Sequence, residues 1–143
     1  LCCVASAGGS ITLKSVVPSD FETVTAVLEN MGCEIERRSN SVKITVDRQL
    51  RAPRPIITRP YPGFPTDAQP LLMAACLKAE GTTAFTENIF ENRYRHATEL
   101  CRLGADISVV GRVAMVTGVS ELIGAPVNAT DLRGGAALVA AAL

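Results

Sequence analysis

The sequence lacks any excess of charge of one sign, because its 143 residues include 14 Lys and Arg and 14 Asp and Glu. Proteins that bind nucleic acid through its phosphates carry an excess of Lys and Arg, which is missing here. No apolar run approaches the roughly 18 residues of a membrane-spanning helix, and residues 1–6 (LCCVAS) lack the basic start of a signal peptide. We therefore expect a cytoplasmic protein that binds neither nucleic acid nor membrane.

Residues suited to metal ligation or redox chemistry are also scarce. His96 is the only histidine, which excludes a metal site with several histidines within this chain. The five cysteines are odd in number and form no C-x-x-C pair, which argues against a disulfide framework or a thiolate zinc site. We expect no metal and no cofactor. Four cysteines fall in helical apolar stretches and are expected to be small core residues: Cys2, Cys3, Cys76 and Cys101.

What the chain does have is an internal repeat. Residues 28–35 (LENMGCEI) align with 100–107 (LCRLGADI), and 7–10 (AGGS) align with 79–82 (AEGT), each pair 72 positions apart. Residues 66–69 (TDAQ) also align with 130–133 (TDLR), 64 positions later. Since 48% of the residues are hydrophobic, units of this length can build a packed core.

Each unit is predicted to run helix, strand, helix, strand, strand. Residues 66–77 predict a buried helix that opens with a T-x-x-Q capping box, and 82–86 predict a strand. A second helix ends at Leu103 before Gly104, and a hairpin follows over 107–110 and 113–117. In the earlier unit, 19–22 (SDFE) predicts another capping box. That helix carries apolar residues at helical spacing: Val24, Val27, Leu28 and Met31.

We interpret residues 1–143 as a single partial domain that is incomplete at both ends, and expect a fragment of a longer repeat protein. Residues 1–50 form the latter part of one unit, 66–127 a second unit and 128–143 the start of a third. The connector 51–65 holds five of the eight prolines. Since proline offers no N–H, this connector is predicted to be extended or an edge strand.

Three apolar positions in the earlier copy of the second helix carry ionisable residues in the later copy. Phe21, Val24 and Val27 correspond to Arg93, His96 and Glu99. In one interpretation the helical register is shifted and these charges face solvent. The packed face would then comprise Tyr94, Ala97, Leu100 and Cys101. In the other interpretation, Arg93 points into a functional site.

Helix starts supply a second set of candidates. Asp67 and Asp131 lie at predicted first turns, where the helix dipole favours a carboxylate. Arg133 opposes the dipole at the same place, which predicts an anion or carboxylate nearby. Several such helix starts brought together would form an anion site from backbone N–H groups, and phosphate is the natural anion.

Three motifs resemble the UDP-N-acetylglucosamine enolpyruvyl transferases: residues 64–69 (FPTDAQ), 86–96 (TENIFENRYRH) and 129–137 (ATDLRGGAA). The similarity extends over all 143 residues, and the sister family, shikimate-phosphate enolpyruvyl transferase, does not share these strings. The resemblance implies an α/β fold of two inside-out barrel domains built from β-α-β-α-β-β units around a central cleft. This chain would form part of the C-terminal domain.

The resemblance also implies a transferase reaction. The enolpyruvyl group of phosphoenolpyruvate moves to the 3-hydroxyl of UDP-N-acetylglucosamine through a tetrahedral adduct, and phosphate is released, in the first committed step of peptidoglycan synthesis. Asp67 matches the carboxylate proposed to take the hydroxyl proton, a role that partial burial would assist by raising its pKa. Ile89 matches a sugar-nucleotide contact and Arg93 a cleft arginine for anionic substrate. Asp131 is expected near the reacting phosphoenolpyruvate carbon, with Arg133 holding the cleft geometry.

Other parts of the family's site have no counterpart here. The reactive loop cysteine belongs to the other domain, and none of the five cysteines lies in its sequence context. We therefore expect the chain alone to be inactive. Two alternatives stay open: a relative that acts on shikimate phosphate, and a non-catalytic module that associates with itself through unpaired apolar faces.

Overall fold

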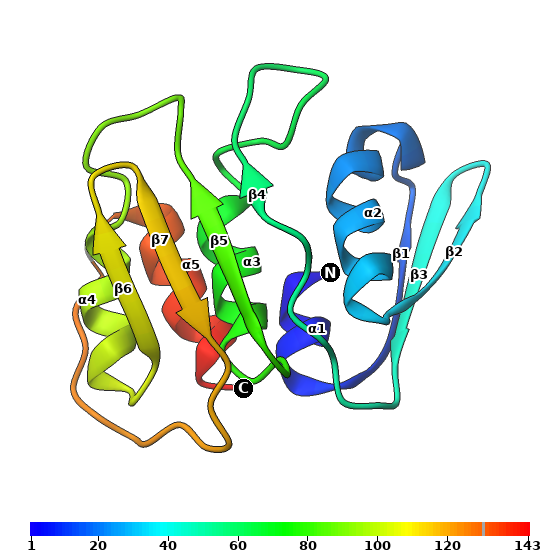
Figure 1. Cartoon of the computed structure of the whole chain (residues 1–143). Helices are drawn as coiled ribbons and strands as arrows, with labels where there is room; N and C mark the ends of the chain where they lie inside the picture. The colour runs from blue at the N-terminus through cyan, green and yellow to red at the C-terminus, as the bar shows by residue number, and fades with distance from the viewer. Residues whose placement is uncertain (130) are drawn as a thin grey trace.

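Two β-sheets and the helices packed on them make up the computed structural model, which describes residues 1–129 and 131–143 (Figure 1). Thr130, the first residue of the predicted 130–133 motif, lies outside the described residues. The N-terminal part comprises α1 (Cys2–Ala7), β1 (Gly9–Lys14), η1 (Pro18–Phe21), α2 (Glu22–Met31), β2 (Glu34–Arg38) and β3 (Ser41–Val46). The rest comprises β4 (Ile56–Ile57), α3 (Gln69–Cys76), β5 (Thr82–Thr86), α4 (Arg95–Arg102), β6 (Asp106–Val110), β7 (Val113–Thr117) and α5 (Leu132–Ala141).

The first sheet has the order β1-β3-β2 and is antiparallel, and the second has the order β4-β5-β7-β6. In the second sheet β4 runs parallel to β5, and the remaining neighbours are antiparallel. The sheets stand side by side in Figure 1, and α3 packs against both α1 and α5. The predicted α/β class is confirmed, with helices rather than a closed barrel at the centre of this chain.

The 72-residue repeat predicted from the sequence is present in the structure. Strand β6 starts 72 positions after β2, and β7 starts 72 positions after β3. Gly32 and Gly104 both have positive φ, 107° and 87°, and end corresponding helices. Leu28 and Leu100 are both fully buried. The two units thus bury the corresponding leucine and end the corresponding helix in the same way. The limits of the units stay predictions.

Neither predicted capping box forms. Helix α3 begins at Gln69 without a side-chain cap, because the Thr66 hydroxyl donates to the Glu87 carboxylate at 2.9 Å instead. In the earlier unit, a 3₁₀ turn over Pro18–Phe21 precedes α2, which also has no side-chain cap. A hydrogen bond from a hydroxyl to a charged carboxylate is stronger than the bond between a hydroxyl and a backbone N–H in a helix cap. At α3, the tertiary contact therefore overrides the local helix-start pattern.

The proline-rich connector is extended, as predicted. Its residues Ile56–Ile57 form β4, the edge strand of the second sheet. Proline is tolerated there because an edge strand leaves one row of N–H groups unpaired. The position of β4 matters for the site, because the loops that leave β4 and β5 emerge at the same end of the sheet (Figure 1).

The cysteines follow the prediction only in part. Cys2 and Cys76 are buried in the core, where burial raises the pKa of the Cys2 thiol to about 11. Cys3 is half-buried, and Cys101 is exposed on α4, so the prediction of a core role for Cys101 is wrong. Helix α4 turns Leu100 and Ala97 inward, which leaves Cys101 on its outer side. Within the described residues, no helix is both long and apolar enough to cross a bilayer.

Candidate functional site

The candidate site lies where the loops after the parallel strands β4 and β5 meet the start of α5. The carboxyl ends of parallel strands share one edge of a sheet, and the loops that leave this edge commonly carry functional residues. The loop after β4 carries Asp67, and the loop after β5 carries Arg93. Arg133 lies in the first turn of α5. Three segments that are distant in sequence therefore deliver charged side chains to one place.

Asp67 is held between two arginines. Arg93 Nη2 donates to Asp67 Oδ1 at 3.0 Å, and Arg133 Nη2 donates to Oδ2 at 2.6 Å. Arg133 Nε also contacts Oδ1, so this guanidinium engages both carboxylate oxygens. The Arg93 side chain is only 15% exposed, whereas that of Asp67 is 56% exposed. The predicted carboxylate partner of Arg133 is thus Asp67, 66 residues away in sequence.

The electrostatics of Asp67 differ from the sequence-based expectation. The hydrogen bond from Arg133, with the positive charges of Arg133 and Arg93, holds the pKa of the Asp67 carboxyl below its usual range. Partial burial was expected to raise this pKa, but burial is outweighed here by the two guanidinium groups. In this arrangement Asp67 is a charged ion-pair partner and a weak proton acceptor.

Asp131 acts at the start of α5 as its N-cap. Its Oδ1 accepts hydrogen bonds from the backbone N–H groups of Arg133 and Gly134, at 2.9 and 2.8 Å. These two bonds, of which that from Gly134 contributes more, lower the pKa of Asp131 below its ordinary value. Asp131 lies one residue before α5 begins and Asp67 two residues before α3 begins, so neither lies in the first helical turn as the sequence predicted. Asp131 thereby orients the turn that presents Arg133.

The segment after β5 is organised around Glu87, which sequence reasoning did not single out. Its carboxylate is buried and accepts four hydrogen bonds, two from hydroxyls and two from backbone N–H groups. The donors are Thr58 Oγ1 at 2.9 Å, Thr66 Oγ1 at 2.9 Å, Ile89 N at 2.8 Å and Phe90 N at 3.1 Å. Glu87 therefore ties the loop after β4 to the loop after β5. A glutamate directly after a β-rich strand was the only signal in the sequence.

Ile89 and Phe90 project from the same loop. Ile89 is partly buried, whereas the Phe90 ring is 51% exposed. The Arg93 guanidinium lies 5.4 Å from the centre of that ring, a cation–π contact that adds to its ion pair with Asp67. The half-exposed Phe90 ring therefore lies beside the charged Arg93–Asp67 pair.

The two interpretations of the altered helix face are each right in part. Arg93 does point to the charged cluster, in agreement with the second interpretation. Tyr94, Ala97 and Leu100 form the packed face, in agreement with the first. His96 lies fully buried on that same face and is not solvated.

Three of the residues predicted for the site come together, and two lie beside them. Asp67, Arg93 and Arg133 are in direct contact, while Ile89 and Asp131 belong to the adjoining loop and helix start. Within the part of the chain that the structure describes, no group of three His, Cys, Asp or Glu residues could hold a metal ion.

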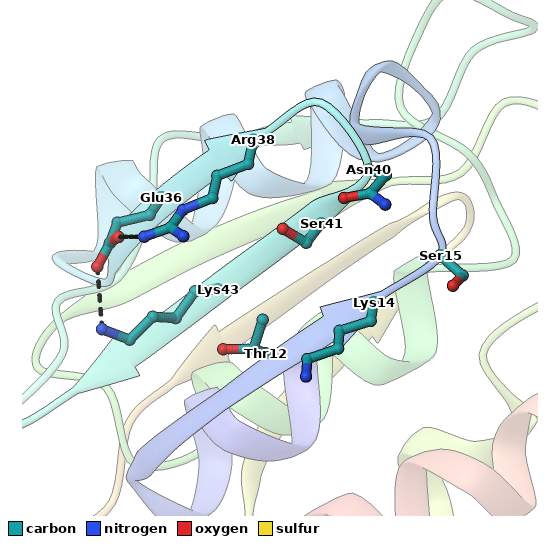
Figure 2. Close-up of a pocket in the computed structure, with 8 residues that line it drawn as sticks. All are labelled: Thr12, Lys14, Ser15, Glu36, Arg38, Asn40, Ser41 and Lys43. Carbon is teal, nitrogen blue, oxygen red and sulfur yellow. Dashed lines mark hydrogen bonds and ion pairs between the residues drawn. The ribbon is translucent and has the colours of Figure 1, made fainter.

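A separate hollow lies away from the candidate site, on the outer face of the first sheet (Figure 2). Its volume is about 490 Å³, and it is lined by polar and charged side chains of β1, β2 and β3. Glu36 already pairs with Lys43 at 2.9 Å and with Arg38 at 3.8 Å. Exposed ion pairs across a solvated sheet face explain this hollow without a ligand.

Comparison with known proteins decides the family. The family model for EPSP synthase (3-phosphoshikimate 1-carboxyvinyltransferase) matches residues 1–143. The chain belongs to the EPSP synthase family. The family assignment agrees with the fold that the three sequence motifs implied.

Within the EPSP synthase family, curated relatives carry the more specific name that the motifs indicated. The chain is 50% identical over 143 residues to the UDP-N-acetylglucosamine 1-carboxyvinyltransferase of Campylobacter fetus. It is 45% identical over 143 residues to UDP-N-acetylglucosamine 1-carboxyvinyltransferase 2 of Caldanaerobacter subterraneus. Both alignments cover 100% of this chain and 34% of the relative, so the chain spans about a third of the length of these relatives.

Solved structures of the EPSP synthase family show the same fold. The enolpyruvyl transferase NikO from Streptomyces tendae superposes with a TM-score of 0.83 and 26% identity, over 99% of this chain and 35% of that chain. EPSP synthase from Acinetobacter baumannii superposes with a TM-score of 0.69 and 18% identity, over 98% of this chain and 35% of that one. At 18% identity, the second likeness supports the fold alone.

Proposed function

We propose that this protein is an enolpyruvyl transferase that moves the enolpyruvyl group of phosphoenolpyruvate to the 3-hydroxyl of UDP-N-acetylglucosamine and releases phosphate. The observation that carries the proposal is the Asp67–Arg93–Arg133 cluster, which combines a carboxylate with two anion-binding guanidinium groups. It is supported by relatives of 45% and 50% identity that are named for carboxyvinyl transfer with UDP-N-acetylglucosamine. Since the chain spans about a third of their length, the rest of the family's site lies in other residues.

The proposed roles follow the chemistry of each side chain. Asp67 accepts the proton of the sugar hydroxyl, and Ile89 contacts the sugar nucleotide. Arg93 and Arg133 bind anionic groups of the substrates. Asp131 stands near the reacting carbon of phosphoenolpyruvate, where its backbone hydrogen bonds keep it ionised.

The low pKa of Asp67 sets a condition on this mechanism. Paired with two arginines, the carboxylate is too weak a base to take a hydroxyl proton efficiently. An anionic substrate group that binds Arg93 and Arg133 would compete with Asp67 for their N–H donors. The carboxylate would then lose the hydrogen bonds that depress its pKa and become more basic when substrate is present.

The reaction balances as an addition followed by an elimination. The sugar oxygen gives its proton to Asp67 and bonds to C2 of phosphoenolpyruvate, while C3 gains a proton. In the second step, the C2–O bond to phosphate breaks and C3 loses a proton, which restores the double bond. The products are the enolpyruvyl ether of the sugar nucleotide and phosphate.

Replacement of Asp67 by Asn tests the central role. In the polypeptide of full family length that contains these residues, we expect Asp67→Asn to fold normally and to lower kcat by at least about 10²-fold, because the proton acceptor is lost. Phosphate release from phosphoenolpyruvate and UDP-N-acetylglucosamine measures this. Asp106→Asn, which alters an exposed carboxylate on β6, is the matched control. Near-normal turnover of the Asp67 variant would reduce Asp67 to a structural ion-pair partner.

The same phosphate-release assay distinguishes the proposed acceptor, UDP-N-acetylglucosamine, from a second candidate. The matching family model is described as 3-phosphoshikimate 1-carboxyvinyltransferase, which favours shikimate 3-phosphate as the alternative acceptor. Turnover with shikimate 3-phosphate and none with UDP-N-acetylglucosamine would favour that reaction. In the reaction we propose, the protein acts in the cytoplasm at the first committed step of peptidoglycan synthesis.

A further inference from the structure

His96 is a buried group that the proposed mechanism does not use. It is the only histidine of the chain, and its side chain is fully buried on α4. Neither ring nitrogen has a hydrogen-bond partner within the described residues. The other buried side-chain atoms in the same condition belong to Gln69 and to Arg93 Nε. Gln69 stands two positions from Asp67 and His96 three positions from Arg93, so unmet polar groups gather beside the Asp67–Arg93 ion pair.

The repeat shows that packing alone does not require a histidine here. The residue 72 positions earlier is Val24, which lies on α2 and is 9% exposed. Neighbouring positions of the two helices match in burial, as Leu28 and Leu100 do. An apolar side chain thus fills this place in the first unit. The second unit instead carries a buried imidazole for which the described residues provide no side-chain hydrogen-bond partner, and such burial is unfavourable and typical of residues kept for function.

The charged groups around His96 belong to the candidate site. After burial, the groups that act on the pKa of His96 are the charge of Asp131, at the start of α5, and the backbone and charge of Arg93, just before α4. The Tyr94 ring lies 6.4 Å from its own, and the Tyr94 hydroxyl donates to the backbone oxygen of Phe85 at 2.8 Å. Helix α4 packs against α5, so the helix that carries His96 adjoins the helix that begins at the Asp131–Arg133 turn.

We propose that His96 is a positioning residue, whose buried neutral ring sets the spacing between Arg93 before α4 and the Asp131–Arg133 turn of α5. It does not touch substrate. It acts through the two helix starts, because a ring of this size and polarity fixes how closely they approach. This inference rests on the proposed function in so far as the cluster is the substrate site.

Replacement by the residue of the first unit tests the proposal. In the full-length protein, His96→Val should fold with an unchanged or higher Tm, since an unpaired polar group is removed. Its kcat/KM should nevertheless fall about tenfold or more, mainly through KM for phosphoenolpyruvate, because displaced arginines bind the anion less well. Leu100→Val, another buried change on α4, should lower Tm and leave KM unchanged. A His96→Val enzyme with kcat/KM within twofold of wild type would overturn the proposal.

A second measurement does not depend on activity. Because His96 is the only histidine, its ring ¹⁵N signals in an NMR spectrum of the 143-residue chain are unambiguous. We expect Asp131→Asn to shift these signals and His96→Val to shift the amide signals of Arg133 and Gly134. Unshifted signals in both variants would overturn the positioning role. A wild-type enzyme without turnover would instead count against the proposed function. The NMR experiment would still test the positioning role of His96, because it does not depend on turnover.

Discussion

Glu87 and His96 are buried ionisable side chains with opposite surroundings. Glu87 accepts four hydrogen bonds and joins the loops after β4 and β5, whereas the ring of His96 has no hydrogen-bond partner among the described residues. A satisfied buried carboxylate holds its neighbours in place, while an unsatisfied ring reduces stability. These residues are therefore expected to respond differently to substitution.

Glu87→Gln should destabilise the site loops. The amide keeps the size of the side chain but turns one acceptor oxygen into a donor that faces other donors, so we expect a loss of about 1–3 kcal/mol in unfolding free energy. Urea unfolding measures the loss, and hydrogen exchange at the Ile89 and Phe90 amides should become faster. Glu91→Gln, which alters an exposed carboxylate 3.5 Å from Arg112, should change neither. Equal stability of the two variants would contradict the role given to Glu87.

His96 should make the chain sensitive to mild acid. Burial lowers its pKa to about 4, whereas the unfolded ring titrates near 6.5. As pH falls below 6.5, the unfolded state takes up a proton that the folded state does not, so stability falls by up to about 1.4 kcal/mol per pH unit. The depressed pKa values of Asp67 and Asp131 act only below their ordinary value of 3.8. Thermal unfolding from pH 7 to 5 should therefore show this loss in wild type and lack it in His96→Val.

At the scale of elements, local patterns predicted strands and helix ends better than helix starts. The hairpin of β6 and β7 and the glycine ends of α2 and α4 depend on alternation and on positive φ, which are local properties. The start of α3 depends on Glu87, 21 residues beyond Thr66, which captures the hydroxyl expected to cap the helix. The missed start of α3 thus has a long-range cause, whereas at α2 a local 3₁₀ turn replaces the predicted box.

Gly118 marks a close approach between elements that no local pattern reveals. A Cβ atom there would lie 1.7 Å from the backbone oxygen of Ala79, and the Gly118 amide donates to the Gly81 oxygen at 3.0 Å. Because the obstructing atoms of Ala79 belong to the backbone and cannot rotate away, Gly118→Ala should cost about 1–3 kcal/mol in unfolding free energy, measured by urea denaturation. Gly124→Ala, where a Cβ would meet nothing within 4 Å, should be nearly neutral. Similar stability of the two variants would refute this assignment.

At the scale of the whole molecule, the second unit differs from the first in where its charges lie. The first sheet carries solvated ion pairs such as Lys43–Glu36, whereas Arg93 of the second unit and Arg133 at the start of the third both point toward Asp67. One fold pattern thus serves as scaffold in one copy and as candidate site in the other. Function within a repeat fold is carried by a few substituted positions.

Apolar side chains at the α5 end of the molecule lead to a prediction of self-association. Leu132, Val139 and Leu143 are 83%, 63% and 67% exposed. We expect the 143-residue chain to form dimers or larger species at high micromolar concentration, measured by sedimentation velocity, because association hides such a surface. Val139→Glu should shift the chain toward monomer, whereas Val110→Glu, on the exposed end of β6, should not. A wild-type chain that stays monomeric would contradict the prediction.

The sequence by itself determined the repeat, the order of elements, the family and the identity of the charged residues. These follow from local periodicity and from motifs, which need no knowledge of distant contacts. It also indicated that an anion or a carboxylate lies near Arg133, because a cation opposes the dipole at a helix start.

Only the tertiary structure decided which carboxylate that is, and what it does to the chemistry. Asp67 and Arg133 are 66 residues apart, and their pairing depends on how α5 packs beside the loops after β4 and β5. The same packing buries His96 and Glu87 and lowers the pKa of Asp67. Burial and charge pairing arise from neighbours in space, so the spacing of residues along the chain could not reveal them.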